Sequence, residues 1–333
     1  MRRFLLCSLS VLALLALGTF AALQLSPWPG ALLIRAVFDS GAQRAFSAQQ
    51  PHLPADIAEQ RDLQYAADSP HAYLDLFYPA SSAQRKLPTI VWIHGGGWVS
   101  GSKALLGNYA RILAGQGFSV AVVGYAIAPG ATYPTPVRQV HAALGYLSRQ
   151  ASMLPVDADK LILAGDSAGA HIAAQVAASL SEPDYAQRIG VQASIARSQL
   201  AAVLLYCGPY DIREVNLDGG FGAFLRTVLW AYSGRKDFQQ DVRFATASVL
   251  PEVSARFPPA FISAGNADPL LGQSQALASA LSKQGVTVET LFFPPDLKPE
   301  LGHEYQFDLD GKPGQQALAR SVAFLRRHIG QPD

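Results

Sequence analysis

The sequence predicts an α/β fold in which helices cover both faces of a mostly parallel sheet. Two patterns carry this prediction. Short apolar runs end at Gly, Pro or Asp, as buried parallel strands do, and amphipathic helical patterns separate these runs along the chain. Half of the 333 residues are hydrophobic and 15% are charged, so one large domain with additions is the expected organisation.

The expected strands start at residues 71–79. Each later apolar run is separated from the one before by enough residues for a crossover, and right-handed crossovers bring the carboxyl ends of parallel strands to one edge of the sheet. Ligand sites of α/β folds form at that edge. The later runs are residues 87–97, 118–129, 160–167, 201–208, 259–269 and 286–294.

Helical periodicity is clearest in segments that lie between the strands or after the last one. Apolar side chains recur there every three or four residues, and Pro313 is an acceptable first helical residue. These apolar positions are Val137, Val140, Leu144 and Leu147 in one helix, Leu277 and Leu281 in another, and Leu318, Val322, Leu325 and Ile329 in the last.

The N-terminal segment has the composition of a membrane or export signal. After Arg2 and Arg3, the chain is uncharged from Phe4 to Leu25. That length crosses a bilayer as a helix, and the preceding positive charges favour an N-terminus in the cytoplasm. We therefore expect residues 1–25 to be a signal-anchor that holds the body outside the cytoplasm. The alternative is a cleaved signal peptide, with export to the periplasm or secretion.

The remaining organisation follows from the strand positions. Residues 26–70 precede the first expected strand and are assigned as a linker or cap segment. The main domain is expected over residues 71–330, with a cap insertion at 213–258 where the gap between two strands is long. Aromatic side chains in this insertion are candidates for the wall of a ligand pocket or for ordinary packing: Phe221, Phe224, Trp230 and Tyr232.

Charge and cysteine content exclude several classes of partner. The 26 Lys and Arg nearly balance the 25 Asp and Glu, and no basic stripe supports nucleic-acid binding. Cys7 and Cys207 lack the spacing of a metal site or of a disulfide framework. The sequence gives no oligomeric state.

Gly165-Asp166-Ser167-Ala168-Gly169 follows an expected strand and opens an expected helix. A tight strand-to-helix turn forces its central residue into a strained conformation, so that the Ser167 side chain projects above the sheet. The flanking glycines leave room where strand and helix backbones meet. Ser167 is therefore the candidate nucleophile, although this motif alone also occurs in ordinary glycine-rich loops.

The run His94-Gly-Gly-Gly-Trp98 ends the strand before the motif. Acyl transfer needs N–H groups that stabilise an oxyanion formed only in the transition state. Consecutive glycines let the backbone approach closely enough to supply them. We assign the oxyanion hole to the N–H groups of Gly96, Gly97 and Ala168, the last at the positive end of the following helix.

Asp268 follows an expected strand, and His303 lies in a loop after the last one. The order Ser167, Asp268, His303 is that of an α/β-hydrolase triad. Together, "HGGGW", "GDSAG", "DPL" and the late histidine resemble esterases of the hormone-sensitive lipase type, over residues 70–330. The chain departs from that pattern at Ala170, at "LGQ" after "DPL", and at "HEYQF"; these changes bear on the subfamily and substrate.

The resemblance implies a serine carboxylic ester hydrolase of the α/β-hydrolase fold that acts through an acyl-enzyme. Ser167 attacks, His303 transfers the proton, and Asp268 orients the imidazole; neither a metal nor a cofactor is required. The expected substrates are small or medium acyl esters. The alternatives are an amidase or peptidase with the same triad, and a non-catalytic binding protein of this fold.

Other polar residues near these motifs receive structural roles. His94 and His171 are expected to be structural, Asp166 to hydrogen-bond locally, and His141 to lie on the surface. Glu304 adjoins the proposed base, but adjacent side chains usually point apart, so Asp268 is the preferred acid.

Overall fold

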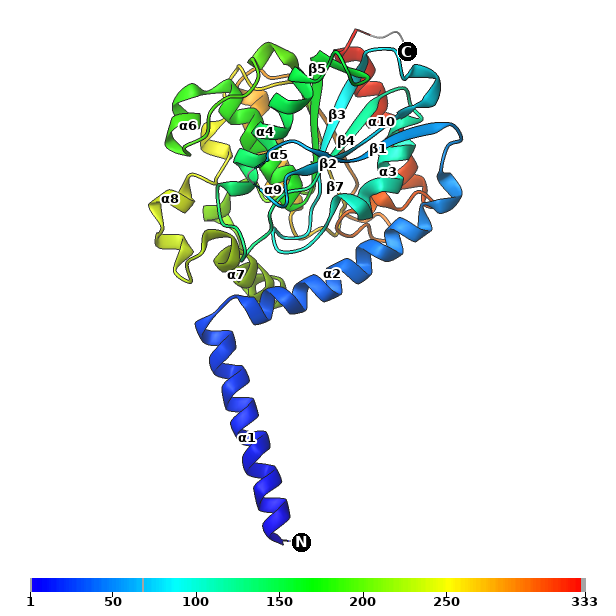
Figure 1. Ribbon diagram of the computed structural model, residues 1–333. Helices are drawn as coiled ribbons and strands as arrows, with labels where there is room; N and C mark the ends of the chain where they lie inside the picture. Colours follow the sequence, from blue (N-terminus) through cyan, green and yellow to red (C-terminus); the bar gives the residue numbers. More distant parts are fainter. Residues whose placement is uncertain (1, 68, 331–333) are drawn as a thin grey trace.

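The computed structural model describes residues 2–67 and 69–330 and confirms the predicted α/β fold (Figure 1). Its centre is an eight-stranded sheet with the order β1-β2-β4-β3-β5-β6-β7-β8. From β4 to β8 all neighbouring strands are parallel. The strands are β1 (Ile57–Gln64), β2 (Tyr73–Pro79), β3 (Leu87–Ile93), β4 (Ser119–Val123), β5 (Val156–Asp166), β6 (Leu200–Tyr206), β7 (Ala260–Ala264) and β8 (Val288–Phe292).

The sheet begins earlier in the chain than the sequence predicts. Residues 57–64, which were assigned to the linker or cap, form the edge strand β1, antiparallel to β2. This strand is half exposed and mostly polar, so it lacks the apolar run by which buried strands are recognised. The correction places the start of the main domain before residue 71.

Helices cover the sheet on both sides. Side chains that alternate along the strands divide the core into two clusters, so that Val91 and Leu163 face one layer of helices while Trp92 and Ile162 face the other. On the first face lie α4 (Thr135–Arg149), α5 (Ala168–Ser181) and α9 (Leu271–Lys283). On the second face lie α3 (Gly107–Ala114) and α10 (Lys312–His328). Helix α6 (Pro183–Arg188) follows α5 and packs on the first face.

Two helices precede the sheet. The first, α1 (Arg2–Leu25), projects away from the body, and α2 (Trp28–Ala48) runs along the underside of the body (Figure 1). Within the part of the chain that the structure describes, no single helix is long and apolar enough to cross a membrane; the pair Leu17–Leu25 and Trp28–His52, bent by 91°, passes that test by length and composition. Met1 of the expected N-terminal segment lies outside the described residues.

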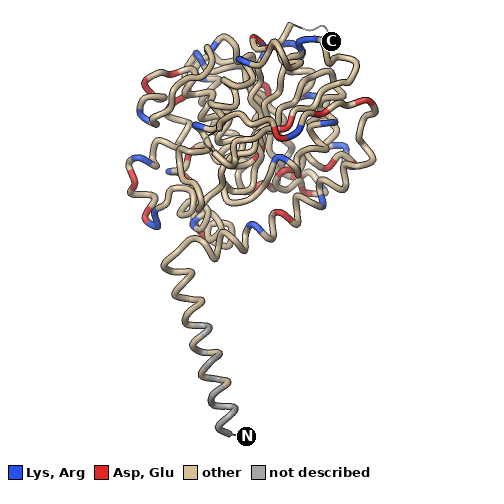
Figure 2. The backbone as a smooth tube through the Cα atoms, viewed as in Figure 1, with Lys and Arg blue, Asp and Glu red and all other residues tan. Residues whose placement is uncertain are grey.

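The long segment between β6 and β7 contains α7 (Gly219–Ser233) and α8 (Val242–Ala245). Helix α7 packs against α2, with the rings of Phe38 and Phe224 5.3 Å apart. These two helices lie beside each other although about 190 residues separate them in the sequence (Figure 1). Charged residues of both signs are interspersed over the body (Figure 2).

Candidate active site

Ser167 occupies a strained turn between β5 and α5. Its φ of 50° and ψ of −122° are unusual for a residue with a side chain, and it immediately precedes the first residue of α5. The Ser167 N–H is held by the carbonyl of Tyr206 at 2.8 Å. The turn therefore fixes the backbone and leaves the hydroxyl at the carboxyl edge of the sheet.

Both glycines beside Ser167 are required by their surroundings. A Cβ at Gly165 would lie 2.6 Å from the carbonyl carbon of Gly169, and a Cβ at Gly169 would lie 2.1 Å from the carbonyl oxygen of Ile93. Neither position has room for a larger residue, because the obstructing atoms belong to the backbone. This close approach of strand and helix is the physical reason for the small residues of the motif.

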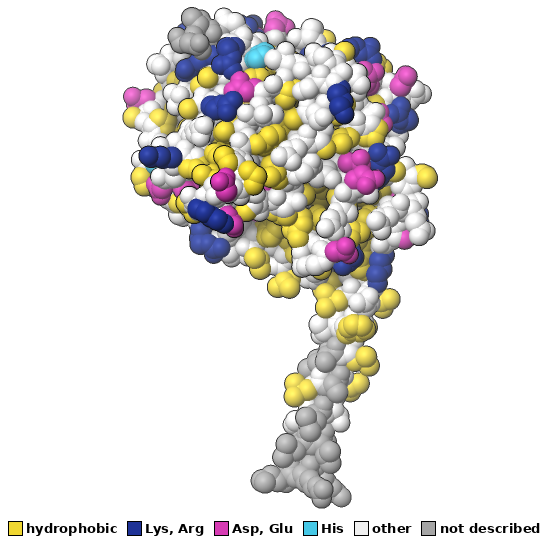
Figure 3. Space-filling model, turned by 180° about the vertical axis from the view of Figure 1, so that it is seen from behind, with side chains coloured by type: hydrophobic (Ala, Val, Ile, Leu, Met, Phe, Trp, Pro, Cys, Tyr) yellow, Lys and Arg dark blue, Asp and Glu magenta, His cyan; other side chains and the backbone are white. Residues whose placement is uncertain are grey.

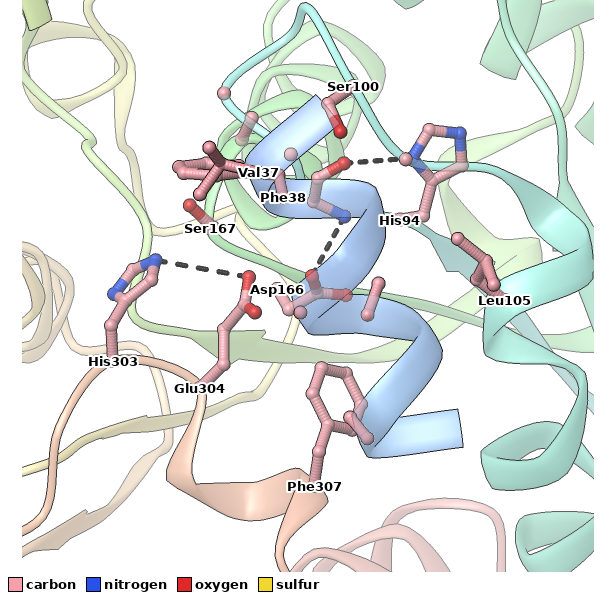
Figure 4. Close-up of a pocket in the computed structure, with 18 of the residues that line it drawn as sticks. Val37, Phe38, His94, Ser100, Leu105, Asp166, Ser167, His303, Glu304 and Phe307 are labelled. Carbon is pink, nitrogen blue, oxygen red and sulfur yellow. Dashed lines mark hydrogen bonds and ion pairs between the residues drawn. The ribbon is translucent and has the colours of Figure 1, made fainter. Parts of the chain in front are cut away.

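His303 lines the same pocket as Ser167 (Figure 4), and its imidazole is hydrogen-bonded to Asp268. His303 Nδ1 lies 2.9 Å from Asp268 Oδ2, and the Asp268 side chain is fully buried. Asp268 Oδ1 accepts the N–H of Leu270 at 2.7 Å, which fixes the carboxylate. Burial alone would lower the pKa of His303. The interaction with the neighbouring Cys207 side chain, the hydrogen bond with Asp268 and the charge of Glu304 outweigh burial, and they raise the pKa of His303 well above its usual range.

The glycine-rich loop after β3 turns through left-handed backbone conformations. Gly96, Gly97 and Trp98 have φ values of 106°, 59° and 61°, a run that L residues rarely adopt. A Cβ at Gly96 would lie 2.4 Å from the carbonyl oxygen of Ser100. The N–H of Gly95 is already bound by Asp166 Oδ2 at 2.8 Å, whereas Ala168 begins α5, where helix N–H groups have no partner within the helix.

Glu304 enters the site, contrary to the expectation that it points away from His303. It has a left-handed conformation, with φ of 60°, and this turn brings its carboxylate to the same side as the imidazole. Glu304 Oε1 lies 3.9 Å from His303 Nε2 (Figure 4). The sequence offered one signal for this placement, the acidic residue that replaces the commoner glycine after the histidine.

Asp166 joins Glu304 to the glycine-rich loop. Besides binding Gly95, it accepts the indole N–H of Trp92 at 2.7 Å, as its expected local role requires. Burial, the charge of Glu304 and a hydrogen bond with Glu304 raise the pKa of Asp166 well above its usual range, although the N–H groups oppose this shift. Asp166 therefore links Glu304 to the N–H groups of Gly95 and Trp92.

A cavity of about 1070 Å³ opens onto Ser167 and His303. Its walls come from α2, α7 and the loops at the edge of the sheet, and most of the wall is apolar. Of the four aromatic residues predicted to line a pocket or to pack, Phe221 and Phe224 line the cavity. Tyr232 instead stacks on Trp98 in the buried core, with ring centroids 4.9 Å apart, and Trp230 packs against that core without lining the cavity.

The other histidines near the motifs have structural contacts. His94 Nδ1 lies 2.8 Å from the Gly95 carbonyl oxygen and stacks on Tyr125, and His171 Nε2 lies 2.8 Å from the carbonyl of Ala247. Burial lowers the pKa of each to about 4, so both rings are neutral. His141 was expected on the surface but is buried, with Nε2 2.8 Å from Ser179 Oγ, because α4 packs on α5.

Cys207 lies next to the histidine and aspartate, and ligand atoms of Cys207, Asp268 and His303 lie within 4.8 Å of one another. Such a cluster has the residue types of a metal site. Burial raises the pKa of the Cys207 thiol to about 11, which disfavours the thiolate that metals bind. His303 and Asp268 already bond to each other, so the cluster fits a proton-transfer chain better than a metal centre.

The chain matches the model of the BD-FAE family over residues 74–281. It is similar to an esterase of Fusarium pseudograminearum, with 26% identity over 74% of this chain and 76% of the relative. It is also similar to an acetyl esterase of Salmonella paratyphi B, with 28% identity over 67% of each chain.

Among solved structures, the fold resembles esterase B of Lactobacillus rhamnosis. The two agree with a TM-score of 0.75 and 26% identity, over 90% of this chain and 96% of that one. A further structure of that esterase, also with a TM-score of 0.75, is described as inhibited by a tributyrin phosphonate.

Proposed function

Because the chain belongs to the BD-FAE family and is a carboxylesterase-type serine hydrolase of the hormone-sensitive lipase type, we propose that Ser167, Asp268 and His303 are its catalytic triad. The observation that carries this proposal is the strained Ser167 turn, which opens onto the same cavity as the imidazole that is hydrogen-bonded to buried Asp268. Strain of this kind costs about 1–3 kcal/mol and is found mainly at functional sites.

The proposed reaction runs through two acyl transfers. His303 Nε2 takes the Ser167 proton while Oγ attacks the ester carbonyl, and the same proton then passes to the leaving alcohol as the C–O bond breaks. Water repeats the sequence on the acyl-enzyme and releases the acid. Asp268 holds the imidazole through Nδ1 and stabilises its protonated form.

The oxyanion of each tetrahedral intermediate is assigned to the N–H groups of Gly96, Gly97 and Ala168. Asp166 supports this arrangement because it binds the preceding N–H, that of Gly95, and so fixes the start of the loop. No step requires a metal or a cofactor.

The proposed substrates are small or medium acyl esters. A cavity of about 1070 Å³ lies at the large end of ordinary ligand sites and has room for more than an acetyl group. The cap is assigned to α2 and to residues 213–258, which contain α7. Two related esterases support short acyl groups, one named an acetyl esterase and one inhibited by a tributyrin phosphonate.

The test is labelling by a serine-directed fluorophosphonate, followed by peptide mass spectrometry. We expect a single adduct on Ser167, and an adduct at another serine would overturn the assignment. A series of p-nitrophenyl esters, with the matching p-nitroanilides, then measures acyl length and the preference for esters over amides.

We further infer that residues 1–25 anchor the enzyme in a membrane with its body outside the cytoplasm, since no charge interrupts Phe4 to Leu25. The test adds protease to intact spheroplasts. Digestion of the body, with full-length protein in the membrane fraction, supports the anchor; a shortened soluble protein indicates a cleaved signal peptide, and protection of the body contradicts the orientation.

A further inference from the structure

Helix α2 is fastened to the body along one face. Arg35 donates to the carbonyl of Val99 at 2.8 Å and to that of Ala128 at 3.2 Å. Asp39 accepts the hydroxyl of Ser100 at 2.7 Å. Both charged side chains therefore point toward the body. Their hydrogen bonds fix the rotation of α2 about its own axis.

The same inner face forms a wall of the catalytic cavity. Phe38, Ala45 and Phe46 line the cavity that Ser167 and His303 share. Figure 4 shows the α2 ribbon crossing the site, with Val37 and Phe38 beside Ser167. A molecule that lies in the cavity beside α2 is therefore also close to the nucleophile.

The outer face of α2 is apolar over its first half. Trp28 is 46% exposed, Leu32 50% and Leu33 68%. Val37, one helical turn beyond Leu33, is 59% exposed and also lines the cavity. These four exposed side chains define the outer face of α2: Leu33 and Val37 lie opposite Arg35 and Asp39 around the helix, and Trp28 and Leu32 are exposed in its first turns. Through Val37, this face extends to the edge of the catalytic cavity.

Exposed apolar side chains are concentrated at this end of the molecule. Among the described residues, every large hydrophobic side chain that is exposed lies between Leu12 and Phe38, except Met153 and Val242. Figure 3 shows these side chains on the projecting helix and on the part of the body next to it. A patch of this kind, continuous with a helix that is uncharged from Phe4 to Leu25, is typical of a surface that meets lipid.

The 91° bend between α1 and α2 sets the direction of this face. If α1 lies along the membrane normal, α2 lies in the membrane plane, with the body on its inner side (Figure 1). Lys236 fixes the bend to the body because its ammonium donates to the carbonyl oxygen of Gln24 at 2.8 Å and to its side-chain oxygen at 3.0 Å.

We propose that the outer face of α2 rests on the lipid surface into which α1 inserts, and that the cavity takes membrane-resident acyl esters from that surface. This inference rests on the proposed esterase function and on the proposed anchor. It names the substrate class as esters that partition into a bilayer, and it makes α2 both a cavity wall and a lipid contact.

The first test uses the full-length protein reconstituted in phosphatidylcholine vesicles. Brominated phosphatidylcholine should quench the fluorescence of Trp28, and Trp28→Phe should abolish most of that quenching. Trp92 and Trp98 are buried, and the partly buried Trp230 is the same in both proteins, so the difference between the two proteins reports on Trp28. Equal quenching in both proteins would overturn the lipid contact.

The second test compares Leu32→Gln/Leu33→Gln with the control Met153→Gln/Val242→Gln, whose targets are 79% and 85% exposed. Neither pair lines the cavity. For a diacylglycerol held in the vesicles, kcat/KM should fall roughly tenfold in the first variant and stay unchanged in the control. Hydrolysis of soluble p-nitrophenyl butyrate should be unchanged in both.

Each other outcome has a distinct meaning. Equal activity of the two variants on the vesicle ester would overturn the inference while leaving the esterase function intact. If the wild-type protein does not hydrolyse the soluble ester, the proposed function is overturned instead. If a second copy covers this face, Leu32→Gln/Leu33→Gln would halve the mass measured by light scattering in detergent, and Trp28 would not be quenched.

Discussion

Glu304 Oε1 lies 3.9 Å from His303 Nε2, on the opposite side of the imidazole from Asp268. The imidazole is thus flanked by two carboxyl groups, one at each ring nitrogen. The His303 side chain is 31% exposed, so solvent screens part of its electrostatic interaction with Glu304.

The first prediction concerns pH. Only neutral His303 accepts the serine proton, and its pKa is raised well above the usual range, so kcat/KM should fall with decreasing pH already above pH 6.5. Glu304→Gln removes one negative charge and should move this acid limb to lower pH. The measurement is a kcat/KM profile for both proteins, with Glu300→Gln on the exposed loop as the control. An acid limb that does not move would show that Glu304 has no influence on the base.

The second prediction concerns the glycine after the nucleophile. In Gly169→Ala the new Cβ would lie 2.1 Å from the Ile93 carbonyl oxygen, so the backbone must shift and the protein should lose about 1–3 kcal/mol of stability. The control is Gly272→Ala in α9, where nothing lies within 4 Å and a gain of roughly 0.5–1 kcal/mol is expected. Urea unfolding measures both, and equal stabilities would contradict the packing described for the turn.

The third prediction concerns Asp166. Asp166→Ala leaves the Gly95 N–H and the Trp92 indole N–H without their acceptor, at a cost of about 1–3 kcal/mol for each buried group. The loop that carries Gly96 and Gly97 should loosen, so kcat should fall more than KM rises. The measurements are thermal unfolding and steady-state kinetics, with exposed Asp296→Ala as the control. A stable variant with normal kcat would remove Asp166 from the support of this loop.

The buried parts of the fold were predictable from sequence because burial leaves a strong apolar signal. The strands around Val91, Leu163 and Leu204 are continuous apolar runs, and the structure places them in the middle of the sheet. The edge strand β1 was missed because it is partly exposed and because four consecutive polar residues, Glu59 to Asp62, interrupt its few apolar ones.

Site geometry was predictable only where sequence order constrains the chain. The Ser167 turn follows from a strand, two glycines and a helix in succession. The position of Glu304 was predicted wrongly because the direction of its side chain depends on its left-handed φ. A glutamate rarely adopts that conformation, so the sequence does not indicate it. His141 was misjudged because its burial depends on how α4 packs against α5.

The central claim is that Ser167 is the nucleophile, and Ser167→Ala tests it most directly. The substitution removes one oxygen and leaves the backbone turn intact, so circular dichroism and melting should match the wild-type protein. Hydrolysis of p-nitrophenyl butyrate should fall by at least about 10³-fold, because only the oxyanion hole and substrate binding remain. A folded Ser167→Ala protein that hydrolyses the ester at a rate near wild type would contradict the assignment.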